Sequence, residues 1–225
     1  MFDKIAFRYD FLNRFLSGGI DVFWRKQLIR QLEEVNPALV LDVATGTADV
    51  AIMIAKRLRS AKVIGIDISE GMLDLGRKKI AKQQLNQQVE LFLGDSEAIN
   101  FPSGTFDAIT AAFGVRNFEH LEKGLAEMYR ALKTDGKIAI LEFSKPRNKL
   151  FRSFYNIYMQ FVATRLGQWL CNNREAYQYL HSSVKAFPES ETFLHILQQV
   201  GFKDTSLKRL SLGICTIYCG RKRTG

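Results

Sequence analysis

The chain alternates between short runs of apolar residues and longer stretches in which apolar residues return every three or four positions. The short runs are typical of strands buried on both faces of a parallel sheet, and the longer spacing is typical of amphipathic helices. Strands are predicted at 38–43, 62–67, 88–93, 106–112 and 136–142, with helices at 47–59, 70–83 and 119–132. This βαβα order predicts a mostly parallel sheet with right-handed crossover connections.

The last third of the chain departs from this alternation. Residues 148–185 are predicted to form a helical insert, and residues 189–200 one more helix. Two late strands, 205–210 and 213–219, are joined by a short turn and predict an antiparallel hairpin. We therefore expect an α/β fold with a seven-stranded, mostly parallel sheet, and we expect all 225 residues to form a single domain.

The N-terminal residues 1–32 have the pattern of two helical pieces on either side of a Ser-Gly-Gly break at 17–19. Such an arm can cover one edge of the sheet. Because adjacent glycines permit hinge motion, the arm can equally act as a lid over a binding site. The sequence does not separate these two interpretations.

The predicted insert carries a broad apolar stripe flanked by arginines. The stripe consists of Leu150, Phe151, Phe154, Tyr155, Tyr158, Val162, Leu166, Trp169 and Leu170. Packing on the core is the favoured interpretation for at least half of these positions. The remaining positions would suit an apolar ligand.

Composition narrows the class of protein. The formal net charge is +9, but the basic residues are dispersed and no RNP-type, zinc-finger or basic-helix motif occurs, so nucleic-acid binding is not expected. The same charge suits peripheral contact with an anionic membrane surface. No apolar run reaches membrane-spanning length and no signal peptide is recognisable. Three cysteines without C-x-x-C spacing favour a reduced, cytoplasmic setting, with the inner face of the cell membrane as the expected surface.

The most informative stretch is 38–51, where an apolar strand ends at Asp42, a turn of small residues follows, and a helical pattern begins. This order brings backbone N–H groups and a helix N-terminus to the carboxyl end of the strand. A second apolar strand ends at Asp67, where a carboxylate can accept hydrogen bonds from both ribose hydroxyls of an adenosine. The dinucleotide pattern G-x-G-x-x-G and the P-loop pattern are both absent.

This arrangement resembles the nucleotide-binding half of class I S-adenosylmethionine (SAM) methyltransferases, whose first motif is D/E-x-G-x-G-x-G. The chain keeps Asp42 and the central Gly46 but has Ala44 and Ala48 at the outer positions, which could narrow the turn. A Rossmann-like turn that only packs a helix on a strand is the alternative for this stretch alone.

A second motif strengthens the resemblance. After the third predicted strand the chain reads Gly-Asp-Ser-Glu at 94–97, and in that class the acidic residue and its neighbour recognise the donor and acceptor edge of adenine. The resemblance implies SAM as cofactor and a class I SAM methyltransferase fold. It implies cofactor contacts from Asp42, Gly46, Thr47, Asp67, Asp95 and Ser96, with Asp42 near the methionine amino group.

Three further stretches are more specific. They are Phe-Asp-Lys-Ile-Ala-Phe-Arg-Tyr-Asp at 2–10, Phe-Gly-Val-Arg-Asn at 113–117 and Ile-Leu-Glu-Phe-Ser-Lys-Pro at 140–146. They resemble the menaquinone/ubiquinone biosynthesis C-methyltransferases, which methylate a polyprenylated quinol ring, and the resemblance covers nearly the whole chain. The chain starts at the first of these stretches, without the extension that many members carry.

Such a reaction needs the reduced quinol as its acceptor. A quinone ring carbon is electrophilic, whereas loss of a phenolic proton from the quinol raises the electron density on the adjacent carbon. The candidates for this work are Arg116, Asn117, Tyr9, Asp10 and Tyr177. Arg116 follows the fourth predicted strand, where it could stabilise a phenolate, and a surface arginine or a carboxylate-paired arginine is the alternative. The histidines lack the spacing of metal ligands, so no metal is expected.

The leading hypothesis is therefore SAM-dependent C-methylation of demethylmenaquinol to menaquinol. The ubiquinone-pathway benzoquinol is an alternative acceptor on the same fold. From other classes, an RNA or protein methyltransferase is disfavoured because no Asn/Asp-Pro-Pro-Tyr signature or RNA-binding appendage occurs. A non-catalytic SAM-binding protein is disfavoured because the 113–117 stretch and the aromatic insert are retained. The oligomeric state is not predictable from this sequence.

Overall fold

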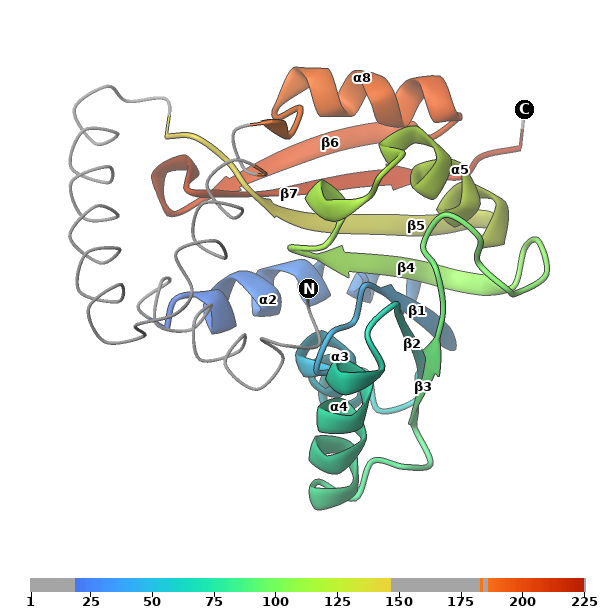
Figure 1. Cartoon of the computed structure of the whole chain (residues 1–225). Helices are drawn as coiled ribbons and strands as arrows, with labels where there is room; N and C mark the ends of the chain where they lie inside the picture. The colour runs from blue at the N-terminus through green and yellow to red at the C-terminus, as the bar shows by residue number, and fades with distance from the viewer. Residues whose placement is uncertain (1–18, 147–182, 184–185, 225) are drawn as a thin grey trace.

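The computed structural model describes residues 19–146, 183 and 186–224 (Figure 1). Most of the predicted insert at 148–185 and the first part of the predicted arm at 1–32 lie outside the described residues.

Within the described residues, seven strands form one sheet in the order β3-β2-β1-β4-β5-β7-β6 (Figure 1). The strands are β1 (Leu39–Val43), β2 (Lys62–Asp67), β3 (Val89–Leu93), β4 (Phe106–Ala112), β5 (Leu132–Phe143), β6 (Lys203–Leu210) and β7 (Cys215–Arg221). The five strands from β3 to β5 pair in parallel, while β7 is antiparallel to both β5 and β6. The predicted parallel sheet with an antiparallel C-terminal hairpin is confirmed.

Helices cover both faces of the sheet, giving three layers (Figure 1). One face carries α2 (Asp21–Arg30), α3 (Asp49–Arg57) and α4 (Glu70–Lys82), and the other carries α5 (Leu121–Ala131) and α8 (Glu191–Val200). Short 3-10 turns are η1 (Glu33–Val35), η2 (Val115–Asn117) and η3 (Ser211–Gly213). Neighbouring residues of β1 pack on opposite faces of the sheet: Val40 lies in the core beneath α2 and α3, and Leu41 lies in the core beneath α5. Burial on both faces explains the continuous apolar runs of the central strands.

Helix α2, from the second half of the predicted arm, is part of the core. Its residues Trp24, Leu28 and Ile29 are buried, and Trp24 Nε1 donates a hydrogen bond to Ser211 Oγ at 2.8 Å. The described part of the arm therefore covers one face of the sheet, and for these residues the expected position at an edge is wrong. The lid interpretation for residues 1–18 concerns residues outside those described.

Several predicted boundaries differ from the structure by up to four residues, and for two strand starts the structure shows the reason. Strand β5 begins at Leu132 rather than 136, because Leu132 is buried and pairs with Phe106 before a register shift that accommodates a turn with Asp135 at φ +60°. Strand β7 begins at Cys215 rather than 213, because the preceding residues form η3, in which Leu212 has φ +57°.

Candidate active site

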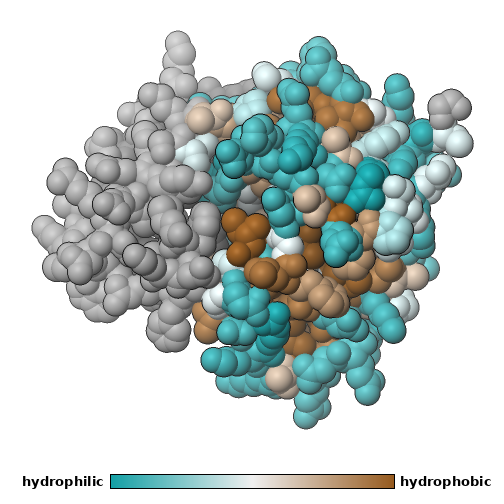
Figure 2. Space-filling model, turned by 45° about the vertical axis from the view of Figure 1, so that its right-hand side comes forward, coloured by the Kyte–Doolittle hydropathy of each residue, from teal (hydrophilic) through white to brown (hydrophobic). Residues whose placement is uncertain are grey.

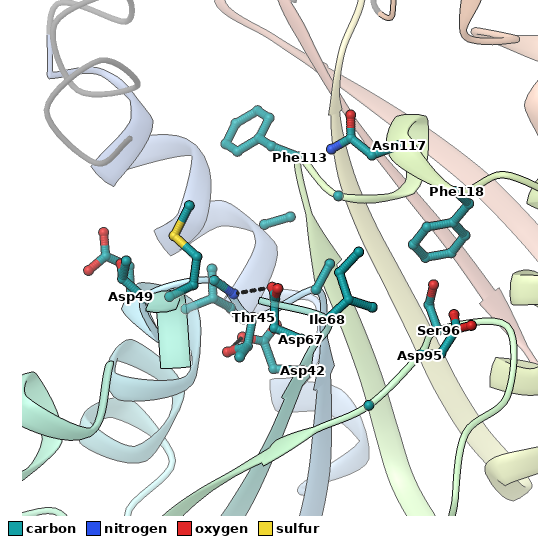
Figure 3. Close-up of a pocket in the computed structure, with 18 of the residues that line it drawn as sticks. Asp42, Thr45, Asp49, Asp67, Ile68, Asp95, Ser96, Phe113, Asn117 and Phe118 are labelled. Atoms are coloured by element: carbon teal, nitrogen blue, oxygen red, sulfur yellow. Dashed lines mark hydrogen bonds between the residues drawn. The ribbon is translucent and has the colours of Figure 1, made fainter. Parts of the chain in front are cut away.

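A cavity of about 290 Å³ lies at the carboxyl ends of β1, β2 and β4 (Figure 3). Chain order reverses here, because β1 has β2 on one side and β4 on the other, and open α/β sheets bind ligands at such points. All six predicted cofactor residues line the cavity: Asp42, Gly46, Thr47, Asp67, Asp95 and Ser96. The structure thus brings together residues that are far apart in the sequence.

The turn after β1 has a left-handed backbone at every second residue. Ala44, Gly46 and Ala48 have φ of +52°, +55° and +64°. These are the three positions at which the class I motif has glycine, and an alanine at such a φ costs about 1 kcal/mol. Glycines on neighbouring elements face the two alanine methyl groups. A Cβ built on Gly114 would meet Ala44 Cβ at 2.6 Å, and one on Gly76 would meet Ala48 Cβ at 3.1 Å.

The Ala44–Gly114 contact predicts a specific rescue. Replacing Gly114 with alanine should weaken binding of S-adenosylhomocysteine (SAH) about tenfold, because its methyl group would overlap that of Ala44 and push the two cavity walls apart. The double variant Ala44→Gly/Gly114→Ala should recover most of the affinity, as measured by calorimetry. Full affinity in the single alanine variant would contradict this close packing of the two loops.

Asp67 joins the turn to the start of α4. Its Oδ2 accepts the Gly46 N–H at 2.8 Å, and its Oδ1 accepts the Ser69 N–H at 2.9 Å. An ionised carboxylate can accept about four hydrogen bonds, so these two N–H groups leave it able to accept ribose hydroxyls. A Cβ built on Gly46 would meet no atom within 4 Å, so the backbone at this glycine faces open space and a ligand can approach it closely.

Asp42 is a buried carboxylate at the base of the cavity. The hydroxyl of Thr45 donates to its Oδ2 at 2.7 Å, and the hydroxyl of Thr110 donates to its Oδ1 at 2.8 Å. Burial raises the pKa of Asp42 to about 6, although both hydroxyl donors and the charge of Arg25 act to lower it. A cationic ligand beside Asp42 would favour the ionised carboxylate, as expected for the amino group or sulfonium of SAM.

Apolar and polar groups share the part of the cavity lined by Asp95 and Ser96. Asp95 Oδ1 accepts the Glu97 N–H at 2.8 Å, which fixes the loop after β3. The side chains of Ile68 and Phe118 line the same cavity, and Ile68 is 65% exposed (Figure 3). An adenine ring needs apolar side chains against its flat faces and polar groups along its edge, and this part of the cavity offers both. The sequence analysis did not select Ile68 or Phe118 as cofactor contacts. The position of Ile68, directly after the predicted ribose-binding Asp67, could have indicated such a contact.

Charges of both signs surround the start of α3, which sequence reasoning also missed. Arg25 Nη1 pairs with Asp49 at 2.8 Å and with Asp21 at 3.1 Å, and both Arg25 and Asp49 line the cavity. Lys79 Nζ pairs with Asp49 at 2.8 Å and donates to the hydroxyl of Thr47 at 2.7 Å. A cavity lined by an arginine and a carboxylate suits a zwitterion such as the methionine part of SAM.

The predicted catalytic residues have different positions. Asn117 lines the cavity, whereas Arg116 is not among the described lining residues and pairs with the buried Glu142 at 2.5 Å. The position of Arg116 therefore agrees with the alternative interpretation, in which this arginine pairs with a carboxylate. Tyr9, Asp10 and Tyr177 lie outside the described residues.

Residues 1–222 match the model of the ubiE/COQ5 methyltransferase family. The chain is 44% identical to the demethylmenaquinone methyltransferase of Bacteroides fragilis over 222 residues, which cover 99% of this chain and 91% of that protein. It is 45% identical to the ubiquinone/menaquinone biosynthesis C-methyltransferase UbiE of Geobacter sulfurreducens over 223 residues, covering 99% of this chain and 87% of that protein.

Solved structures share the fold. A SAM-dependent methyltransferase from Aquifex aeolicus superposes with a TM-score of 0.59 at 22% identity, covering 82% of each chain. Phosphoethanolamine N-methyltransferase 2 of Haemonchus contortus, solved with SAM bound, gives a TM-score of 0.62 at 15% identity, covering 83% of this chain and 49% of that one. The predicted SAM-dependent methyltransferase fold is confirmed.

Proposed function

Because the chain belongs to the ubiE/COQ5 methyltransferase family, we propose that it transfers a methyl group from SAM to a ring carbon of a polyprenylated quinol. The proposed reaction converts demethylmenaquinol to menaquinol. The observation that carries the proposal is the near-full-length similarity to a demethylmenaquinone methyltransferase. A relative named for both quinone pathways is equally similar, so the ubiquinone-pathway benzoquinol is the alternative acceptor.

The described cavity fits the cofactor of this family. Asp67 would hold the ribose, the loop carrying Asp95 and Ser96 would hold the adenine, and Asp42 would lie near the methionine amino group. When bound, SAM supplies an electrophilic methyl carbon. The chain itself must hold the quinol, accept its phenolic proton and keep water out of the cavity.

The residues that we propose for the acceptor side include one described residue and three that lie outside the described part of the chain. Asn117 lines the cavity from the turn after β4. Tyr9, Asp10 and Tyr177 belong to parts of the chain that the structure does not describe. We propose that this set orients the quinol and accepts its proton. In the overall reaction, one ring carbon gains a methyl group and loses its hydrogen as a proton.

Methyl-labelled SAM tests the proposal. The protein is incubated with demethylmenaquinol, a benzoquinol, the two oxidised quinones, RNA and unrelated protein, and the label is then located. We expect label on the ring carbon of the reduced demethylmenaquinol, and lower incorporation into the benzoquinol. Label in RNA or protein would contradict the proposal, and equal turnover of the oxidised quinone would contradict the requirement for the quinol.

We further propose that the chain works in the cytoplasm in peripheral contact with the membrane that holds its substrate. Among the described helices, none has the length and apolarity needed to cross a bilayer. The net charge of +9 would attract anionic lipid. Figure 2 shows apolar residues gathered near the centre of one face, with hydrophilic residues above and below them. Flotation with anionic vesicles should show salt-sensitive association, and equal recovery with neutral vesicles would count against this contact.

A further inference from the structure

Glu142 is a fully buried carboxylate near the end of β5. Its Oε1 accepts a hydrogen bond from Arg116 Nη1 at 2.5 Å and one from the Phe143 N–H at 3.0 Å, and its Oε2 accepts the Arg116 N–H at 3.3 Å. The Glu142 side chain is 0% exposed and that of Arg116 is 3% exposed. Removing two charges from water carries a large penalty, so stability alone is a weak explanation for this pair.

The segment held by this pair forms one wall of the cavity. Its cavity side consists of Phe113, Gly114, Asn117 and Phe118. The residues between them are anchors, because Val115 is buried in the core that contains α5 and Arg116 pairs with Glu142. Lining and anchoring residues therefore belong to a single short segment, 113–118, and displacement of the anchors would displace the lining.

This segment does not hold its conformation by regular secondary structure. Phe113 has φ +59°, a strained value for a non-glycine residue, which persists only where the surroundings fix it. The following 3-10 turn is three residues long. The Phe113 N–H donates to the Leu141 carbonyl at 2.8 Å, and the next residue of β5 is Glu142. Consecutive residues of β5 thus fix both ends of the strained stretch from Phe113 to Arg116.

Aromatic packing extends the effect of the pair to the cavity wall. The Arg116 guanidinium carbon lies 5.4 Å from the ring centroid of Phe143. The Phe143 ring in turn packs against that of Phe113, with 4.6 Å between centroids. Phe113 lines the cavity, so a change at the ion pair would reach the wall by this route as well as through the backbone.

We propose that Glu142 is a positioning residue for methyl transfer. Through Arg116 it fixes residues 113–118, and so it sets the place of Asn117 at the acceptor side of the cavity. Both Glu142 and Arg116 fall in stretches that carry the family resemblance, yet neither is among the described residues that line the cavity. The inference rests on the proposed function, because the acceptor side is assigned there.

The test compares Glu142→Gln with Glu142→Asp. The amide removes the charge from the pair, and the shorter acid keeps the charge but displaces the Arg116 contact. For Glu142→Gln we expect kcat to fall about 30-fold, because misplacement of an acceptor-side group by an ångström is costly, and we expect the KM for SAM to rise by less than that factor. SAH affinity should fall less than kcat does, and by no more than the roughly tenfold loss expected of Gly114→Ala, because Gly114 and Phe118 of the same segment also line the cavity. Retained SAH binding also shows that the variant is folded. Glu142→Asp should lose less activity, and it replaces Glu142→Gln if that variant does not fold.

Hydrogen–deuterium exchange gives a readout that does not depend on turnover. Amides of residues 113–118 should exchange about tenfold faster in Glu142→Gln than in the wild type. Lys137→Met is the matched control, because Lys137 is a buried cation of the same strand whose Nζ pairs with Glu34 at 2.8 Å, away from the cavity. The control should leave both kcat and the exchange of 113–118 unchanged.

Three results would overturn the inference. They are unchanged kcat and exchange, a fall in kcat without faster exchange, and loss of SAH binding in a folded variant. The second would mean that the pair acts on the substrate itself, and the third that it belongs to the cofactor half of the site. If the wild type methylates no quinol, the proposed function fails, but exchange still decides whether Glu142 fixes the segment.

Discussion

Replacing Asp67 with alanine should weaken SAH binding by about 100-fold or more, because two hydrogen bonds from ribose hydroxyls to a charged acceptor would be lost. The substitution also removes the acceptor for the N–H groups of Gly46 and Ser69. The turn after β1 would then lose its tie to α4. Calorimetric titration with SAH measures the effect, and methyl transfer should fall at least as far.

Asp107→Ala is the matched control for this substitution. Asp107 Oδ2 likewise accepts two backbone N–H groups, from Ala38 at 3.1 Å and Leu39 at 2.8 Å, but at the opposite end of the sheet. Its loss should lower the melting temperature and leave SAH affinity unchanged. If the two variants weaken SAH binding equally, the effect at Asp67 is a general loss of structure and not loss of a ligand contact.

Replacing Asp42 with asparagine should stabilise the unliganded protein while impairing cofactor binding. Burial raises the pKa of Asp42 from 3.8 to about 6, so at neutral pH the fold carries an ionised carboxylate at a cost of about 3 kcal/mol. Asparagine removes that cost and can still exchange hydrogen bonds with Thr45 and Thr110. We expect the melting temperature to rise by about 5 °C and SAH affinity to fall about tenfold.

The pH dependence follows from the same pKa. Because the folded state holds the Asp42 proton more tightly than the unfolded state, the stability contribution of this group is lost as the pH rises from about 4 through 6. Cofactor affinity should change in the opposite sense, weakening as the pH falls below about 6, because a protonated Asp42 no longer attracts a cation.

Thr110→Val provides the control for this pH dependence. It removes a hydroxyl donor that lowers the pKa of Asp42, so it should move the midpoint of the affinity profile to higher pH. Affinity that does not vary with pH in the wild type, together with an Asp42→Asn variant that binds normally, would contradict the role given to this carboxylate.

Much of the cofactor half could be predicted because its chemistry is local in sequence. Asp42 and Asp67 each come at or next to the end of an apolar run, and parallel strands bring such ends to one edge of the sheet. Asp95 follows the third run in the same way. The apolar runs were therefore enough to place Asp42 and Asp67 at one edge of the sheet, and the resemblance to class I SAM methyltransferases added Asp95 to the cofactor site.

The contacts that could not be predicted join elements whose relative positions depend on packing. Arg116 meets Glu142 only because β4 and β5 pair in a particular register, and Arg25 reaches Asp49 only because α2 packs beside α3. The close approach of Ala44 to Gly114 likewise depends on two loops meeting across the sheet. From the sequence alone, Arg116 could be placed after the fourth strand, but Glu142 could not be identified as its partner.

The central claim is that the cavity between the turn after β1 and the loops after β2 and β3 is a SAM site. Calorimetric titration of the wild-type chain with SAH at pH 7.5 tests it most directly. The structure predicts one molecule bound per chain, with a rise in melting temperature on binding. Absence of both heat and thermal stabilisation at millimolar SAH would contradict the claim, whatever the similarity of the sequence to known methyltransferases.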